Sequence, residues 1–111
     1  MAAQPAPAPS LSHGAAIEYK AFSRAFHKNS GHVLYLVATC SYGTPGFGLF
    51  FQAEPGLAQF ELMETAPTGI EPQLVTYYIA SWTNAQPLSQ PPTHVKIKDA
   101  QGEHLVTVKP W

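Results

Sequence analysis

The sequence contains little cysteine and little charge. Cys40 is the only cysteine among 111 residues, which excludes an intrachain disulfide and any metal or iron–sulfur site held by several thiolates. Charged residues make up 12% of the chain, about half the share of an average globular protein. Six basic residues, spread along the chain, give no cationic stripe for a phosphate backbone, so nucleic acid is not an expected partner.

Long hydrophobic runs are also missing. No apolar run approaches the roughly 20 residues that a membrane-spanning helix needs, and no cationic amphipathic segment indicates binding to a membrane surface. The N-terminal residues lack the basic region and apolar core of a secretory signal. We therefore expect a cytoplasmic protein by default, while the processed form of an exported protein would show the same features.

Enzyme signatures are missing as well. The chain has no glycine-rich phosphate loop, no G-x-S-x-G elbow and no H-E-x-x-H motif. The pair Glu61 and Glu64 has opposite strand parity, so its carboxylates would point to different faces and would not act together on one bond. Cys40 falls inside an apolar segment, where a thiol is expected to be buried and inert. We predict a non-catalytic protein without a cofactor.

The residues that are abundant favour short strands. Hydrophobic residues make up 45% of the chain, which also has eleven prolines and eight glycines; this composition is typical of a globular fold with many turns. Residues 1–14 carry prolines without apolar periodicity and are predicted to be a disordered tail. Residues 15–111 have the length of one domain.

The strongest strand pattern lies at residues 33–40, which are apolar on both parities. This pattern predicts a strand covered on both faces. Thr44, Pro45 and Gly46 then predict a tight turn, with a positive φ at the glycine. Because residues 47–51 form another apolar run, we expect a central hairpin.

Four further segments complete the prediction of an all-β fold. They are residues 17–27, for which a helix over 15–29 stays open as an alternative, residues 57–66, residues 73–82, and a C-terminal hairpin that turns at 99–102. The hairpin carries lysines at outward positions, which discourage pairing of a free edge; they are Lys96, Lys98 and Lys109. About seven short strands favour an antiparallel β-sandwich of immunoglobulin-like type, although the Cys…Trp…Cys pattern of antibody domains is absent.

Aromatic residues near turns and strand ends are the candidate binding residues. They are Tyr42, Phe47, Tyr77 and Trp82. Such rings can anchor a protein partner or stack on sugars, or they can simply close the ends of a small sandwich. Since low surface charge favours association, we predict first a module that binds another protein or itself, through the face of residues 74–82 or an edge strand. A carbohydrate- or ligand-binding module that uses the four aromatics is the alternative.

Histidines offer a third hypothesis. His27 and His32 flank a predicted turn, while His94 and His104 lie on the two arms of the C-terminal hairpin. A zinc or copper site would need at least three of these four side chains to converge. Solvated histidines at strand ends explain the same pattern, so no metal site is assigned.

Overall fold

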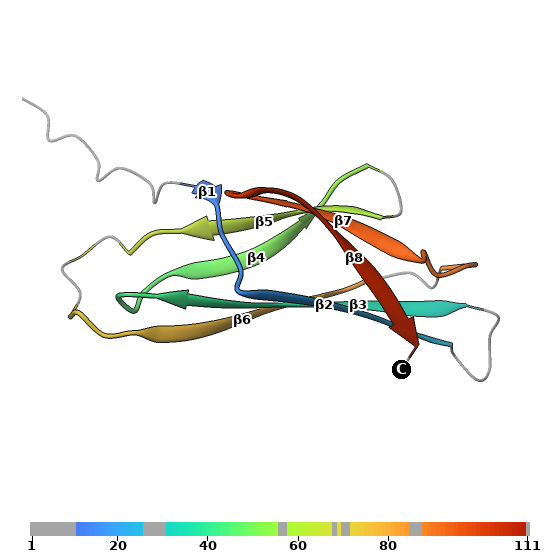
Figure 1. Ribbon diagram of the computed structural model, residues 1–111, viewed down its shortest axis with the longest axis horizontal. Coiled ribbons are helices and arrows are strands. Elements are labelled where there is room, and N and C mark those ends of the chain that lie inside the picture. Colours follow the sequence, from blue (N-terminus) through green and yellow to red (C-terminus); the bar gives the residue numbers. More distant parts are fainter. Residues whose placement is uncertain are drawn as a thin grey trace, which may run out of the picture.

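The computed structural model describes residues 11–25, 31–55, 58–67, 69, 72–84 and 88–110. Within these residues all regular structure is β, as the sequence predicts (Figure 1). The strands are β1 (Leu11–His13), β2 (Glu18–Ala25), β3 (His32–Tyr42), β4 (Gly48–Ala53), β5 (Gln59–Thr65), β6 (Thr76–Thr83), β7 (His94–Asp99) and β8 (Gly102–Pro110).

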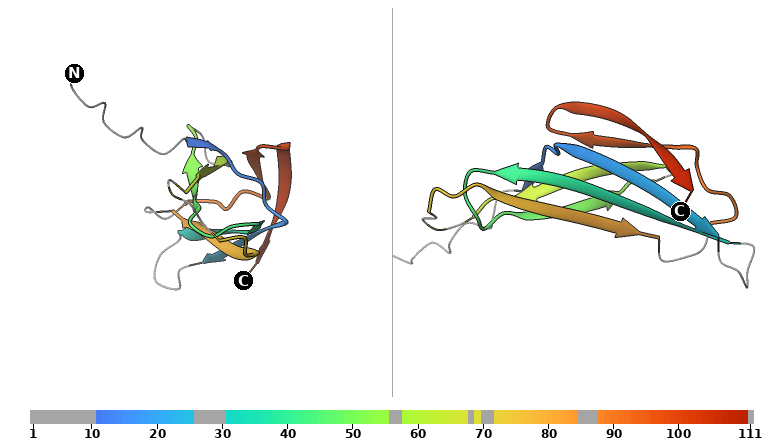
Figure 2. Two further views of the ribbon diagram at one scale, coloured as in Figure 1. Left: turned by 90° about the vertical axis from the view of Figure 1, so that its left-hand side faces the viewer. Right: turned by 60° about the horizontal axis from the view of Figure 1, so that its bottom comes forward.

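The strands form one mixed sheet that is curled into a half-barrel (Figure 2). Their order along the sheet is β1-β5-β7-β8-β2-β3-β6, and β4 also pairs with β5. Because β4 occupies one edge of β5 along residues 60–65, β1 and β7 share the opposite edge. The expected antiparallel, immunoglobulin-like sandwich is not what this sheet forms, since β2 pairs with β8, and β5 with β7, in parallel.

The C-terminal hairpin joins the two halves of the sheet. The predicted turn is confirmed, with Gly102 at a φ of 120°. On its outer sides β7 pairs with β5 and β8 pairs with β2. The three exposed lysines of the hairpin therefore do not protect a free edge, because each lies at a position that is paired on the outer side, with β5 or with β2. Residues 103–107 of β8 have no such outer partner among the described strands. These parallel pairings join residues far apart in the chain, which local patterns do not reveal.

The predicted central hairpin is wrong. Residues 43–47 do turn the chain, with Gly46 at a φ of 95°, but β3 pairs with β2 and β6 whereas β4 pairs with β5. The turn thus carries the chain from one side of the half-barrel to the other. Turn chemistry fixes the change of direction and not the pairing of the two arms. β6 matches β3 over eight register positions and occupies the edge that β4 would need.

The core lies on the concave side of the sheet. One parity of β3 is fully buried there, and it packs with side chains from β4, β5 and β7. The fully or nearly fully buried members are Ala21, Leu34, Leu36, Ala38, Cys40, Phe51, Phe60, Leu62, Ala80, Val95 and Ile97. The opposite parity, residues 33, 35, 37 and 39, is only half-buried. The prediction that β3 is covered on both faces is therefore wrong, because no described element packs over its outer face.

The remaining strand predictions hold with shifted boundaries. Residues 18–25 form a strand rather than a helix, residues 59–65 form β5, and β6 starts at Thr76 instead of residue 73. The end of the predicted tail is corrected, because Leu11–His13 pairs with β5 as β1. The rest of that predicted tail, residues 1–10, lies outside the described residues.

Candidate functional site

The four predicted aromatic residues do not form one surface. Tyr42 and Phe47 stack at the corner between β3 and β4, with ring centroids 4.0 Å apart and planes inclined by 10°. Trp82 packs edge-on against Phe60, at 4.7 Å, on the core side of the sheet. Tyr77 belongs to the opposite face of β6 and is exposed. The structure thus brings Tyr42 and Phe47 together and leaves the other two rings on different faces.

Exposed apolar side chains form a strip along β6 on the outer face of the sheet. Val75, Tyr77 and Ile79 have exposed fractions of 63%, 68% and 72%, and we call these three residues the β6 strip. β6 itself carries no charged residue. In the register, Ile79 lies beside Thr39, next to the half-buried Val37 on the same face of β3. The apolar pattern on both parities of residues 73–82 was the sequence signal for this surface.

Hydrogen bonds hold the start of β6 against the turn between β3 and β4. The backbone N–H of Leu74 donates to the carbonyl of Gly43 at 2.9 Å. The N–H of Gly46 donates to the phenol oxygen of Tyr78 at 2.8 Å. Since β6 is also paired with β3 along its length, the β6 strip is presented by a fixed element rather than by a free loop.

A buried carboxylate on the other side of the sheet organises a network that sequence reasoning missed. The Asp99 side chain has no exposed surface and accepts three hydrogen bonds. They come from the Tyr19 hydroxyl at 2.6 Å, from Nε2 of His104 at 2.9 Å and from the backbone N–H of Gln101 at 2.8 Å. The turn motif explained only the last of these, because Tyr19 is 80 positions away in the chain.

The electrostatics of this network keep the carboxylate charged. Burial disfavours the ionised form of Asp99, but the hydrogen bonds from Tyr19 and His104 outweigh burial and hold the pKa of Asp99 below its ordinary value. Burial, followed by the hydrogen bond to Asp99, raises the pKa of Tyr19. The phenol therefore remains a donor, and the carboxylate fixes the orientation of both rings.

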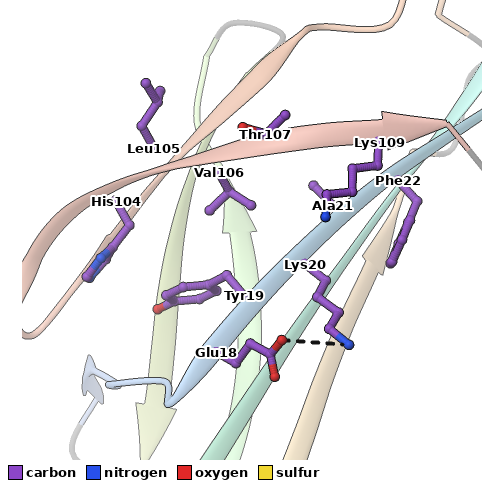
Figure 3. A pocket seen from close by; sticks show the side chains of 10 residues that line it. All are labelled: Glu18, Tyr19, Lys20, Ala21, Phe22, His104, Leu105, Val106, Thr107 and Lys109. Atoms are coloured by element: carbon purple, nitrogen blue, oxygen red, sulfur yellow. Dashed lines mark ion pairs between the residues drawn. The ribbon is translucent and has the colours of Figure 1, made fainter.

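A cavity opens between β2 and β8 above this network (Figure 3). The two strands pair only where residues 21–23 meet residues 108–110, and they diverge toward their N-terminal ends. The space between them has a volume of about 570 Å³, and we call it the β2–β8 wedge. Figure 3 shows His104 and Val106 pointing from β8 toward Tyr19, while Leu105 points away.

The histidines do not converge within the described residues. The register places His94 opposite Thr107 and His104 opposite Ile97, so the two histidines are not cross-strand partners. His27 lies outside the described residues. Among the residues that are described, no three or more histidine, cysteine or acidic side chains are arranged to hold a metal ion.

The thiol of Cys40 is expected to be unreactive in the folded protein. It has no exposed surface, and burial, together with the charges of Glu64 and Asp99, raises its pKa to about 11. At pH 8 only about one thiol in a thousand would be ionised. We expect the native protein not to react with Ellman's reagent within minutes. In a denaturing concentration of guanidinium, about 6 M, one equivalent of thiol should react. Rapid labelling of the native protein would contradict the buried placement.

The described part of the chain thus offers two features for binding, the β6 strip and the β2–β8 wedge. It contains no helix that is long and apolar enough to cross a membrane. Comparison of the chain with models of protein families, with curated proteins and with solved structures found no match.

Proposed function

We propose that this chain is a non-catalytic β domain that associates with a second copy of itself through the outer face of β3 and β6. The observation that carries the proposal is the β6 strip, in which three large apolar side chains are each more than 60% exposed. Covering apolar surface stabilises a complex by about 25 cal/mol per Å² before the costs of association. A contiguous exposed apolar patch is typical of an interaction site.

The composition of this face favours a second copy as the occupant. A strip without charge offers no complement to a charged partner, whereas a twofold axis near Ile79 would place apolar side chains against apolar side chains. The half-buried side chains of β3, at residues 33, 35, 37 and 39, lie on the same face of the sheet, beside the strip. The ion pair of Glu18 and Lys20, with 3.6 Å between the charged groups, lies beyond them on β2. An apolar centre with a polar border is typical of protein interfaces.

Two observations support a non-catalytic role. The carboxylate of Asp99 is buried and already accepts three hydrogen bonds, so it is poorly placed to take a proton from a substrate. The thiol of Cys40 is buried, and its raised pKa makes it a poor nucleophile. Both groups serve the fold in this arrangement.

Sedimentation velocity over a range of protein concentrations tests the proposal. We expect the wild-type chain to form dimers, and the Ile79→Lys variant to dissociate with a Kd at least tenfold higher, because a charge would be buried in the interface. Since Ile79 is 72% exposed in the single chain, its replacement should change the free energy of unfolding by less than about 0.5 kcal/mol.

Leu105→Lys is the matched control, because Leu105 is 70% exposed on β8, away from the strip. This variant should dimerise like the wild type. A wild-type chain that stays monomeric at all concentrations, or a Leu105→Lys variant that dissociates as readily as Ile79→Lys, would reject self-association through β6.

A further inference from the structure

The wedge side of β8 carries backbone groups without a partner among the described residues. The N–H of Val108 donates to the carbonyl of Thr93, its register partner. Hydrogen-bonded pairs alternate along an antiparallel ladder, so Val106 and His104 also direct their backbone groups to β7. The residues between them, Glu103, Leu105 and Thr107, must direct N–H and C=O away from β7. The N–H and C=O groups of Glu103 and Leu105 and the N–H of Thr107 face the wedge, because β8 joins β2 only at residues 108–110, where the parallel pairing of Ala21 with Val108 engages the C=O of Thr107.

The wedge has the dimensions of a short extended peptide. Residues 103–107 span about 13 Å at about 3.3 Å per residue, which would match roughly five residues of a paired strand. The cavity of about 570 Å³ falls within the range of sites that bind ligands. An exposed strand edge beside such a cavity is the arrangement in which proteins capture an extended segment by adding a strand to their sheet.

The side chains around the wedge favour a ligand that carries acidic groups. Lys20 and Lys109 are exposed among the lining residues, whereas Glu18 is the only acidic one. Glu18 already pairs with Lys20, and Lys109, at the closed end where the strands meet, has no ion-pair partner among the described residues. Val106 and the exposed Leu105 provide apolar contacts next to this positive charge.

We infer that the β2–β8 wedge binds an acidic, extended peptide segment of a partner protein, which pairs with residues 103–107 of β8 and places a carboxylate near Lys109. Its alternate side chains would contact Val106 and Leu105. The network of Asp99, Tyr19 and His104 forms a rigid floor for this site. The site is separate from the β6 strip, so it does not depend on self-association.

Selection of random heptapeptides displayed on phage against the intact chain tests this inference. We expect the enriched peptides to alternate apolar and polar residues and to contain aspartate or glutamate. When such a peptide is synthesised and added to labelled protein, the amide signals of Glu103, Leu105 and Thr107 should shift, and their hydrogen exchange should slow at least tenfold. Lys109→Glu should weaken binding at least tenfold, whereas Lys98→Glu, on β7, should not.

Two further variants separate backbone pairing from other modes of binding. Two versions of the peptide carry methyl groups on every second backbone nitrogen, one at the odd and one at the even positions. One version should fail to bind, because its methyl groups replace the N–H groups that pair with β8. Leu105→Pro removes a donor that faces the wedge without removing a bond to β7, so it should also abolish binding.

Several outcomes would overturn the inference. They are the absence of an acidic consensus, full binding of both methylated peptides, and signal changes centred on β6. Concentration-dependent shifts of the same three amides in the Ile79→Lys variant without peptide would assign the wedge to a second copy instead, and would overturn it too.

Discussion

Leu36→Ala is expected to lower the free energy of unfolding by about 3–4 kcal/mol, a large part of the stability of a domain of this size. Leu36 has no exposed surface and lies in the middle of β3, between Ala21 on β2 and Trp82 on β6. Ala21 is too small to fill the space that the leucine would leave. A cavity should therefore remain, and its cost adds to the lost transfer free energy.

Val37→Ala is the control for this prediction. Val37 is the next residue of β3, but it belongs to the half-buried outer face. Since part of its side chain is already in water, its truncation should cost about 1 kcal/mol. Urea unfolding followed by fluorescence would give both values. Equal losses at the two positions would contradict the assignment of the core to one parity of β3.

Asp99→Ala is expected to lower the free energy of unfolding by about 3 kcal/mol at pH 7. The substitution removes the acceptor of three hydrogen bonds and leaves the Tyr19 hydroxyl and the His104 ring without their partner. Asp99→Asn should cost less. The amide oxygen can still accept from Gln101 and His104, so mainly the contribution of the charge is lost.

The dependence of the free energy of unfolding on pH in the acid range tests whether Asp99 is ionised in the folded chain. Because its pKa is lower in the folded than in the unfolded chain, its contribution is complete above about pH 5 and is lost as the pH falls below about 4. The difference in unfolding free energy between wild type and Asp99→Asn should therefore be constant near neutrality and shrink in acid. A difference that does not change between pH 7 and pH 3 would reject an ionised Asp99 in the fold.

Local patterns were sufficient to predict every strand except β1, which lies within the predicted tail. Period-two alternation identifies the inward Val95 and Ile97 and the outward lysines of the C-terminal hairpin, because side chains of a strand alternate between two faces. The positive φ of Gly46 and Gly102 also follows from residue type. These features depend on neighbours in the chain, and the sequence contains them directly.

The pairing of strands and the buried network could not be predicted in this way. Both parities of residues 33–40 are apolar, and this pattern does not distinguish a second covering layer from an outer face left half-exposed. The parallel pairing of Ala21 with Val108, and the hydrogen bond between Tyr19 and Asp99, depend on the closure of the whole sheet. The turn motif gave Asp99 a sufficient local role, so nothing in the sequence indicated its contact with Tyr19.

Because local patterns do not show which strands pair, they identify the candidate site only in part. The apolar alternation of residues 73–82 predicted a strand there, and the structure has β6 at residues 76–83, paired with β3. Period two already places Tyr77 and Trp82, five positions apart, on opposite faces, but it does not show that the face of Trp82 would pack on the core and that of Tyr77 would stay exposed. The β2–β8 wedge was missed entirely, because it exists only where two distant strands fail to stay paired.

The position of the C-terminal hairpin has a consequence for how the protein folds during its synthesis. Among the described strands, β8 alone pairs with both β7 and β2, so the two halves of the sheet cannot be joined until residues 102–110 have left the ribosome. Until then β2, β3 and β6 would carry an open edge and an uncovered apolar surface. Nascent chains in this state are vulnerable to aggregation, and their closure over such long loops is intrinsically slow. Closure of the sheet therefore has to wait for β8, whose pairing with β2 joins two segments that are far apart in the sequence.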